Sequence, residues 1–300
     1  MYRVAVIGTT PTAYATAIAC KAAGFRETKL FMTTEDEPHD PQTIHCLPAS
    51  VTRILHTLCG EPLEDFGLCP DREQVRLGRS AYLLSELPLG AFYSERYGAP
   101  LINVTGEALL SLLNPTGALA ERPEQRTLEE IEQSHEVSIL CSAMESRDPA
   151  PEERAETFKV FKATTTERHS LRNANVTWIG KGQVIIQRST SGLTHYTLIT
   201  TGDLPLRSSE WHESLTPAFA DKQLHQIFSP NTHLIKYQFF EGRRAYLGDA
   251  CYHPHPCFLE SQNSGIEDAW VLSRMMENYE EDIGDGLREY ERYRRPRAVK

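Results

Sequence analysis

The first part of the chain alternates between short apolar runs and a segment rich in small residues. Residues 2–7 (YRVAVI) are mostly apolar and end at Gly8, which predicts a buried strand. Residues 13–23 are rich in Ala and end before Gly24, which predicts a helix, and residues 29–32 predict a second strand. This order of strand, helix and strand is typical of dinucleotide-binding sheets.

Further along the chain, the pattern predicts both helices and strands. Residues 42–58 predict a segment that enters a helix with Pro48 in its first turn, and residues 107–113 predict a second helix. Residues 69–97 are rich in strand-like runs, and residues 137–140 are typical of a buried strand.

Residues 157–237 alternate between apolar and polar positions, which predicts an antiparallel sheet. The clearest strands are 158–164, 183–189 and 194–200, and the Gly-Lys-Gly sequence at 180–182 predicts a turn. Successive side chains of a strand point to opposite faces, so one face of this sheet is available to cover a site.

The last part of the chain combines a strand, a polar loop and two helices. Residues 244–247 predict a strand that delivers Gly248 and Asp249 into a loop rich in His and Pro. Residues 266–278 and 286–293 predict helices, and the acids at the start of the first one lie where the helix dipole favours negative charge.

Composition narrows the functional classes. The chain has 300 residues, of which 40% are apolar and 24% are charged, as in ordinary globular proteins. The net charge of −10 argues against nucleic acid and anionic membranes as partners, and residues 288–300 are expected to form a solvated basic helix end. No apolar run reaches the about 18 residues of a membrane span, and no signal peptide is recognisable, so we expect a cytoplasmic protein.

The seven cysteines include no CxxC pair, and their odd number favours reduced thiols. We expect no metal site, although His253 and His255, flanked by Cys251 and Cys257, keep one open as an alternative. The sequence leaves the oligomeric state open.

Residues 246–269 carry the sharpest resemblance to a known family. Their sequence, YLGDACYHPHPCFLESQNSGIEDA, resembles the second flavin motif of the class A flavin monooxygenases, in the branch that contains salicylate hydroxylase. Residues 88–100 and 290–297 are also similar to that family, and the resemblance covers nearly the whole chain. The family pattern is kept at Gly248, Asp249, Ala250, Asn263, Ile266, Glu267, Asp268 and Ala269.

This resemblance implies an α/β fold of the p-hydroxybenzoate-hydroxylase kind. It comprises a Rossmann-like FAD-type lobe and an antiparallel β-sheet substrate lobe, and here it is shortened between residues 114 and 135. The expected FAD-type lobe is discontinuous and comprises residues 1–69, 100–148 and 242–300, while residues 70–99 and 149–241 form the substrate lobe.

Four of the five cofactor-binding features of the family are altered in this chain. The phosphate turn reads Gly8-Thr-Thr-Pro-Thr-Ala13 instead of G-x-G-x-x-G, so Thr10 places a side chain where bare backbone approaches a diphosphate, and Pro11 removes an N–H donor. The ribose-binding acid, the flavin-touching Arg and the Asp-Gly pair are replaced by Thr33-Thr34, Thr105-Gly106 and Ala143-Met144. We therefore expect no bound cofactor, with a diverged but working turn as the alternative. If FAD is bound, the resemblance assigns Gly8, Arg147 and Asp249 to it.

Three functions remain open. The first is a flavin-free enzyme that catalyses a redox-neutral cyclisation or isomerisation, for example a pericyclic Diels–Alder step, of an apolar small molecule by preorganisation and hydrogen-bond activation. The second is an FAD-dependent aromatic hydroxylase that uses NAD(P)H. The third is a non-catalytic protein that binds a small molecule.

The candidate catalytic residues lie in and next to the polar loop. His253 and His255 are natural acids or bases near neutral pH, and Asp249 is placed to orient an imidazole. The alternative is that the prolines of the loop turn both histidines into solvent. The predicted substrate-binding residues are Tyr252, His45, Arg188, Tyr196, Tyr237 and Asn263, and strand parity alone does not decide which sheet residues face the pocket.

Overall fold

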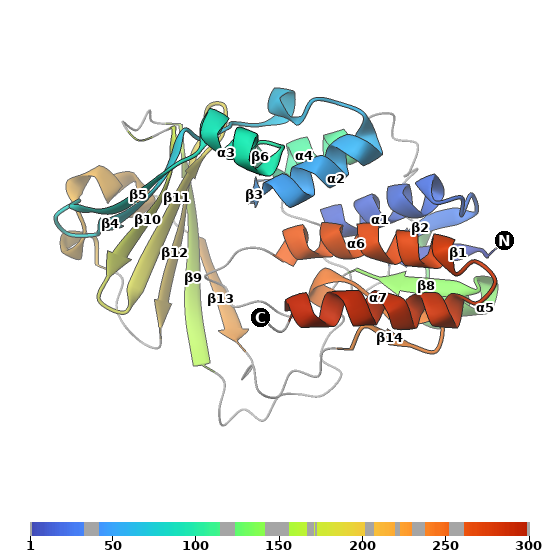
Figure 1. Ribbon diagram of the computed structural model, residues 1–300. Helices are drawn as coiled ribbons and strands as arrows, with labels where there is room; N and C mark the ends of the chain where they lie inside the picture. Colours follow the sequence, from blue (N-terminus) through green and yellow to red (C-terminus); the bar gives the residue numbers. More distant parts are fainter. Residues whose placement is uncertain are drawn as a thin grey trace.

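A computed structural model (Figure 1) describes residues 2–32, 42–114, 124–141, 156–166, 171, 173–201, 207–219, 223–229, 238–251 and 261–298. Two large sheets and one small sheet organise the described residues. Each large sheet draws its strands from separate stretches of the sequence, so residues far apart in the chain meet at their faces and ends.

The parallel sheet has six strands in the order β14-β15-β8-β1-β2-β7. Its centre is β1 (Val4–Ile7), which runs parallel to β8 (Val137–Leu140) and to β2 (Thr28–Met32). All residues of β1 and β8 are buried, as expected for continuous apolar runs in a parallel sheet. The outer strands are β7 (Glu124–Gln125), β15 (Arg244–Tyr246) and the antiparallel β14 (Phe240–Glu241).

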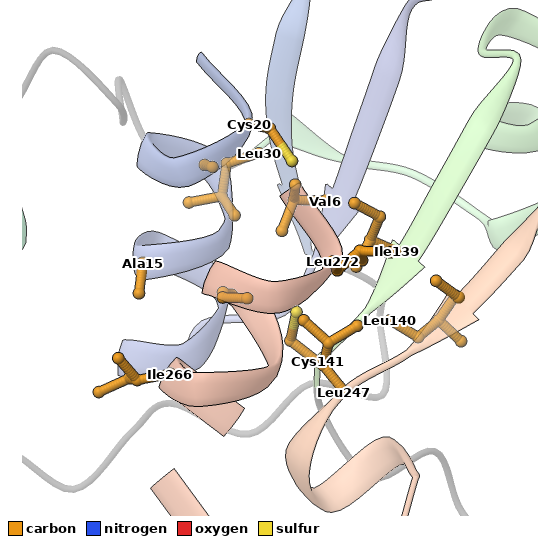
Figure 2. Close-up of a cluster of buried hydrophobic side chains, with 14 of the residues drawn as sticks. Val6, Ala15, Cys20, Leu30, Ile139, Leu140, Cys141, Leu247, Ile266 and Leu272 are labelled. Atoms are coloured by element: carbon orange, nitrogen blue, oxygen red, sulfur yellow. The ribbon is translucent and has the colours of Figure 1, made fainter. Parts of the chain in front are cut away.

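Three helices, α1 (Pro11–Ala22), α6 (Ser261–Asn278) and α7 (Ile283–Ala298), lie side by side next to this sheet (Figure 1). A Cβ added at Gly265 would lie 2.2 Å from Thr12 Oγ1, so α1 and α6 approach each other at a contact that requires glycine. Figure 2 shows part of the core that the helices form with the strands: Val6, Ala15, Cys20, Leu30, Ile139, Leu140, Cys141, Leu247, Ile266 and Leu272.

Local sequence signals set the ends of the shorter helices α2 (Ala49–Cys59), α3 (Gly90–Tyr97), α4 (Gly106–Leu113) and α5 (Leu128–Ser134). α5 begins at a capping box, in which Glu130 N donates to Thr127 Oγ1 (3.3 Å) and Thr127 N donates to the Glu130 carboxylate (3.0 Å). α2 and α3 end at Gly60 and Gly98, whose φ angles of +74° and +76° are those of glycine C-caps.

The antiparallel sheet has seven strands in the order β13-β9-β12-β11-β10-β4-β5, and only the β10–β4 pair is parallel. A small antiparallel pair lies between the two large sheets, because Thr43 next to it accepts a hydrogen bond from Lys162 of the antiparallel sheet and Leu47 is part of the other core. The antiparallel sheet comprises β4 (Arg72–Leu77), β5 (Leu83–Pro88), β9 (Glu156–Thr165), β10 (Ala174–Gly180), β11 (Gln183–Ser189), β12 (Thr194–Thr201) and β13 (Gln223–Ser229), and the small pair comprises β3 (Ile44–Leu47) and β6 (Ile102–Thr105).

The two faces of the antiparallel sheet have different neighbours. On one face, Trp178, Tyr196 and Trp211 form a hydrophobic cluster with residues of the short helix η4 (Glu213–Phe219). The other face carries Arg188 on β11 and His195 on β12, which are paired across the strands. This second face is turned toward β3 and β6, and we call it the inner face.

The structure corrects several predicted element ends. α6 begins at Ser261 rather than at residue 266. Glu267 and Asp268 therefore lie in its second turn and not at its N-terminus, where the helix dipole would favour their charge. Both acids instead accept hydrogen bonds from Arg294 of α7, so part of the predicted solvated basic tail is buried. Residues 90–97, predicted within a strand-rich stretch, form the helix α3.

The observed elements confirm the predicted fold class, an α/β protein with a Rossmann-like lobe and an antiparallel sheet. The lobe boundaries at residues 69, 99, 148 and 241 stay a prediction. Among the described residues, none of the helices combines the length and apolar character that a membrane crossing requires.

Candidate active site

The turn between β1 and α1 joins the central strand of the parallel sheet to a helix N-terminus. Gly8 follows β1 with a φ angle of +139°, a conformation that glycine adopts without strain. Thr10 is the N-cap residue of α1, and its carbonyl oxygen accepts a hydrogen bond from Ala13 N (2.9 Å). The N-terminus of α1, with its partial positive charge, therefore lies at the carboxyl end of the central strand.

Two threonine hydroxyls lie at this helix start. Thr12 is 1% exposed, and both its N–H (3.2 Å) and its hydroxyl (2.9 Å) donate to Gln262 Oε1. Thr10 Oγ1 is buried and has no hydrogen-bond partner among the described residues. Both Thr12 donors at this helix start are therefore bonded to Gln262, and the Thr10 hydroxyl is left for a further oxygen acceptor.

Asp249 lies at the end of β15, in the short helix η6 (Gly248–Ala250). Gln262 Nε2 donates to Asp249 Oδ2 (3.4 Å), so Gln262 connects this carboxylate with the start of α1. Gly248 N donates to Asp268 Oδ2 (3.0 Å), and Asp268 is in turn paired with Arg294. The position of Asp249 is therefore supported by buried charges on two helices.

A cluster of amides connects the small sheet with the antiparallel sheet. Asn103 Nδ2 donates to Asn175 Oδ1 (2.7 Å) and to the carbonyl oxygen of Ser189 (3.1 Å). Asn263, which is 8% exposed, donates to the carbonyl oxygen of Cys46 on β3 (2.8 Å). Asn103 Oδ1 and Asn263 Oδ1 are buried and accept no hydrogen bond from the described residues. These amides bring β11, β3 and α6 to one place.

Arg188 lies on the inner face next to this cluster. It is paired across the strands with His195, whose Nδ1 is 3.1 Å from Thr164 Oγ1. Arg188 Nε and Nη1 are buried and have no hydrogen-bond partner among the described residues. A half-buried guanidinium with two buried nitrogens that lack a partner favours an anionic ligand, and a carboxylate matches its geometry.

The predicted site residues differ in where they lie. Asp249, Asn263 and Arg188 lie at or between the two large sheets, and His45 is buried on β3 at 5% exposure. Tyr196 lies on the other face of the antiparallel sheet in the cluster with Trp178 and Trp211, because its strand parity is opposite to that of His195. We therefore correct its assignment and give it no role in substrate binding.

The other predicted residues, Tyr252, His253, His255, Tyr237 and Arg147, lie outside the described residues. The described part of the chain holds no group of three side chains that could bind a metal ion. None of the described cysteines forms a disulfide. Burial raises the pKa of Cys20 to about 12 and that of Cys59 to about 11, so these thiols stay protonated and unreactive at neutral pH.

A cavity of about 410 Å³ lies elsewhere, between α2, α6 and α7. Its lining includes Arg53, Arg294 and Arg297, but Arg294 and Arg297 are both paired with Glu267, which also lines it. Because Arg294 and Arg297 already have a partner, we place the candidate site at the start of α1 and at the inner face instead.

The structure also identifies residues that the sequence did not single out: Gln262, Asn103 and Asn175. Gln262 lies in a polar run, 261–265 (SQNSG), that has no apolar periodicity and was assigned to the loop. Its contact with Thr12 could not be predicted from the sequence, because the two residues are 250 positions apart.

Comparisons with known proteins identify similar enzymes. No protein-family model matches the chain. A 3-amino-4-hydroxybenzoate 2-monooxygenase of Streptomyces platensis is 25% identical over 84% of this chain and 74% of its own length. A second monooxygenase of that name from the same organism is 40% identical, but over only 19% of this chain and 14% of its own length.

Solved structures extend the similarity over the whole chain. A variant of HpxO from Klebsiella pneumoniae in complex with FAD has a TM-score of 0.76 at 17% identity, covering 100% of this chain and 87% of that one. A 2,6-dihydroxypyridine-3-hydroxylase from Arthrobacter nicotinovorans has a TM-score of 0.74 at 11% identity, covering 98% and 88%. The chain has the fold of the FAD-dependent monooxygenases and resembles the class A flavin monooxygenases over nearly its full length.

The prediction that the protein has no cofactor is contradicted by these structures. HpxO and CtdE, which share the fold, were both solved with FAD bound. From the sequence, the side chain of Thr10 was expected only to obstruct a diphosphate. In the structure, the hydroxyls of Thr10 and Thr12 are donors at a helix N-terminus, and this donor set fits an anionic diphosphate.

Proposed function

We propose that this protein is an FAD-dependent monooxygenase that hydroxylates a small aromatic acid. The observation that carries the proposal is Arg188, whose buried N–H groups have no partner among the described residues on the inner face. The similar proteins are enzymes, and one is named as acting on an aminohydroxybenzoate, a substrate that carries a carboxylate. A guanidinium binds such a carboxylate through two parallel hydrogen bonds.

The residues at the start of α1 would hold the cofactor. Thr10 and Thr12 would donate to its diphosphate, and Asp249 matches the family position that binds the ribityl chain. When bound, FAD would pass two electrons from NAD(P)H to O2, so that one oxygen atom enters the aromatic ring and the other leaves as water.

The protein's own residues would position the substrate. Arg188 would fix one end of the aromatic ring, and the amide cluster of Asn103 and Asn175 would hold β11 at a constant distance from β6. Positioning of this kind is a large part of the rate enhancement of an enzyme, because it removes the entropy cost of alignment.

We do not propose the redox-neutral cyclisation or isomerisation that the sequence suggested. It depended on an absent cofactor and on His253 and His255, which lie outside the described residues. A non-catalytic binding protein is the outcome if the purified protein binds FAD and an aromatic acid but does not oxidise NAD(P)H.

The test combines spectroscopy with steady-state kinetics. The purified protein is incubated with FAD, passed through a gel-filtration column, and assayed for NAD(P)H oxidation with 3-amino-4-hydroxybenzoate and with the corresponding neutral amide. We expect a retained flavin band and turnover of the acid over the amide. A folded, colourless protein after this treatment would reject the proposal.

Variants of Arg188 test the substrate class. Arg188→Met should raise the KM of the acid about 10- to 100-fold, which corresponds to the loss of charge-assisted hydrogen bonds, and should leave the KM of the amide unchanged. Arg188→Lys should recover part of the loss, because it keeps the charge without the paired geometry. Arg26→Met, at an exposed arginine, is the matched control. Equal effects on acid and amide would show that Arg188 does not bind the carboxylate.

A further inference from the structure

Gln262 lies in the first turn of α6, between two features of the candidate cofactor site. Its Oε1 accepts from Thr12 N (3.2 Å) and from Thr12 Oγ1 (2.9 Å), and its Nε2 donates to Asp249 Oδ2 (3.4 Å). One side chain thus contacts both the start of α1, where a diphosphate is expected, and the acid expected at the ribityl chain.

The hydrogen bonds fix the orientation of the Gln262 amide. The Thr12 N–H can only donate and the Asp249 carboxylate can only accept, so only one of the two amide orientations fits both neighbours. The amide oxygen therefore lies where an oxygen of a bound anion would meet the N-terminus of α1.

We propose that Gln262 occupies the diphosphate position of the empty protein and must withdraw before FAD binds. The proposal rests on the proposed function, because it takes FAD to be the ligand. Gln262 would then lower the affinity for FAD, since only the fraction of molecules with a withdrawn side chain is competent to bind.

The structure favours movement of the side chain over movement of the helices. Thr12 is in close contact with Gly265 one turn further along α6, where even a Cβ would lie 2.2 Å from Thr12 Oγ1. This contact holds α1 and α6 together, so the site opens by rotation of Gln262 alone. A diphosphate then replaces a neutral acceptor with a charged one, which binds a helix N-terminus more strongly.

The test measures ligand affinity rather than activity. Dissociation constants of FAD, ADP and riboflavin are determined by fluorescence and calorimetry for the full-length protein and for Gln262→Ala, Gln262→Glu and Gln133→Ala. ADP carries the diphosphate without the flavin, and riboflavin carries the flavin without the diphosphate. Gln133→Ala is the matched control, because Gln133 is exposed and bonds only to a neighbouring glutamate of its own helix. Circular dichroism checks the fold of each variant.

We expect Gln262→Ala to bind FAD and ADP about 10-fold more tightly than the unchanged protein and riboflavin equally well, because the three hydrogen bonds of the amide no longer hold the site closed. Gln262→Glu should bind FAD more weakly than the unchanged protein, because its carboxylate repels the diphosphate. Equal FAD affinity in Gln262→Ala and the unchanged protein would overturn the role of Gln262 and leave the proposed function intact. Folded proteins that bind neither FAD nor ADP would overturn both.

Discussion

Arg294 shows how a single residue connects the candidate site to the rest of the molecule. It is 5% exposed, and it bonds to Asp268 and to Glu267 (3.1 Å) on the neighbouring helix. Asp268 is fully buried and also accepts from Gly248 N (3.0 Å), the residue before Asp249. The loop that carries Asp249 therefore depends on a buried charge contributed by α7.

Replacing Arg294 should destabilise the protein strongly. Arg294→Met removes the positive charge and leaves the buried Asp268 without that partner, which we expect to lower the free energy of unfolding by about 3–5 kcal/mol. Arg292→Met removes an exposed arginine paired with Glu289 and should cost much less, because water screens this pair. Urea unfolding measures both values. A similar small loss in both variants would mean that the buried pair contributes little.

The sequence contained part of the signal for Arg294. It was assigned to a solvated basic tail, because four arginines follow one another closely in residues 292–297. Its helical spacing from Leu287 and Tyr290 places it on the buried side of α7, and this side could have been predicted from the sequence. Its acidic partners could not have been predicted, because nothing in one sequence shows which two helices pack together.

At the scale of whole elements, the start of α6 shows why the site was only partly predicted. Apolar periodicity begins at Ile266, so the polar run 261–265 was assigned to the loop. The structure extends the helix to Ser261, because Gln262, Asn263 and Gly265 find partners on α1 and β3. Tertiary contacts decide this helix start, and local propensity does not.

The contact between α1 and α6 gives a prediction whose sign depends on the background. Gly265→Ala should lower the free energy of unfolding by about 1–3 kcal/mol, because the new Cβ would lie 2.2 Å from Thr12 Oγ1. In a Thr12→Ala background, the nearest atoms are gone, and the same change should be neutral or stabilise by up to about 1 kcal/mol, since Ala is the better helix former. Thermal and urea unfolding of the four proteins measure the coupling. The same loss in both backgrounds would place the strain elsewhere.

At the scale of the whole molecule, the residues of the inner face were the hardest to predict from the sequence. Arg188 and Tyr196 were both predicted to line the pocket, and the register of β11 and β12 places them on opposite faces. A slip of one residue would exchange the two faces, so the choice depends on pairing across the whole sheet. The parallel sheet was simpler to predict, because its apolar strands are continuous and buried on both faces.

Breaking the connection between the small sheet and the antiparallel sheet should weaken substrate binding and leave FAD binding unchanged. Asn103 is fully buried and bridges β6 to Asn175 and to the Ser189 carbonyl, the residue after Arg188. Asn103→Leu leaves these groups without that partner, so we expect a loss of about 1–3 kcal/mol in the free energy of unfolding. We also expect a higher KM for the aromatic acid, because Arg188 is no longer held at a fixed distance from β6.

The matched control for this variant is Asn173→Ala, which removes an exposed amide that bonds to Asp71 (3.3 Å) at the margin of the same sheet. Unfolding, KM and FAD affinity are measured for both variants and for Asn175→Ala. The control should resemble the unchanged protein in all three, and Asn103→Leu should keep its FAD affinity, because Thr10, Thr12 and Asp249 lie on other elements. A weaker affinity for FAD together with an unchanged KM would mean that Asn103 supports the cofactor lobe alone and that the inner face is positioned by other contacts.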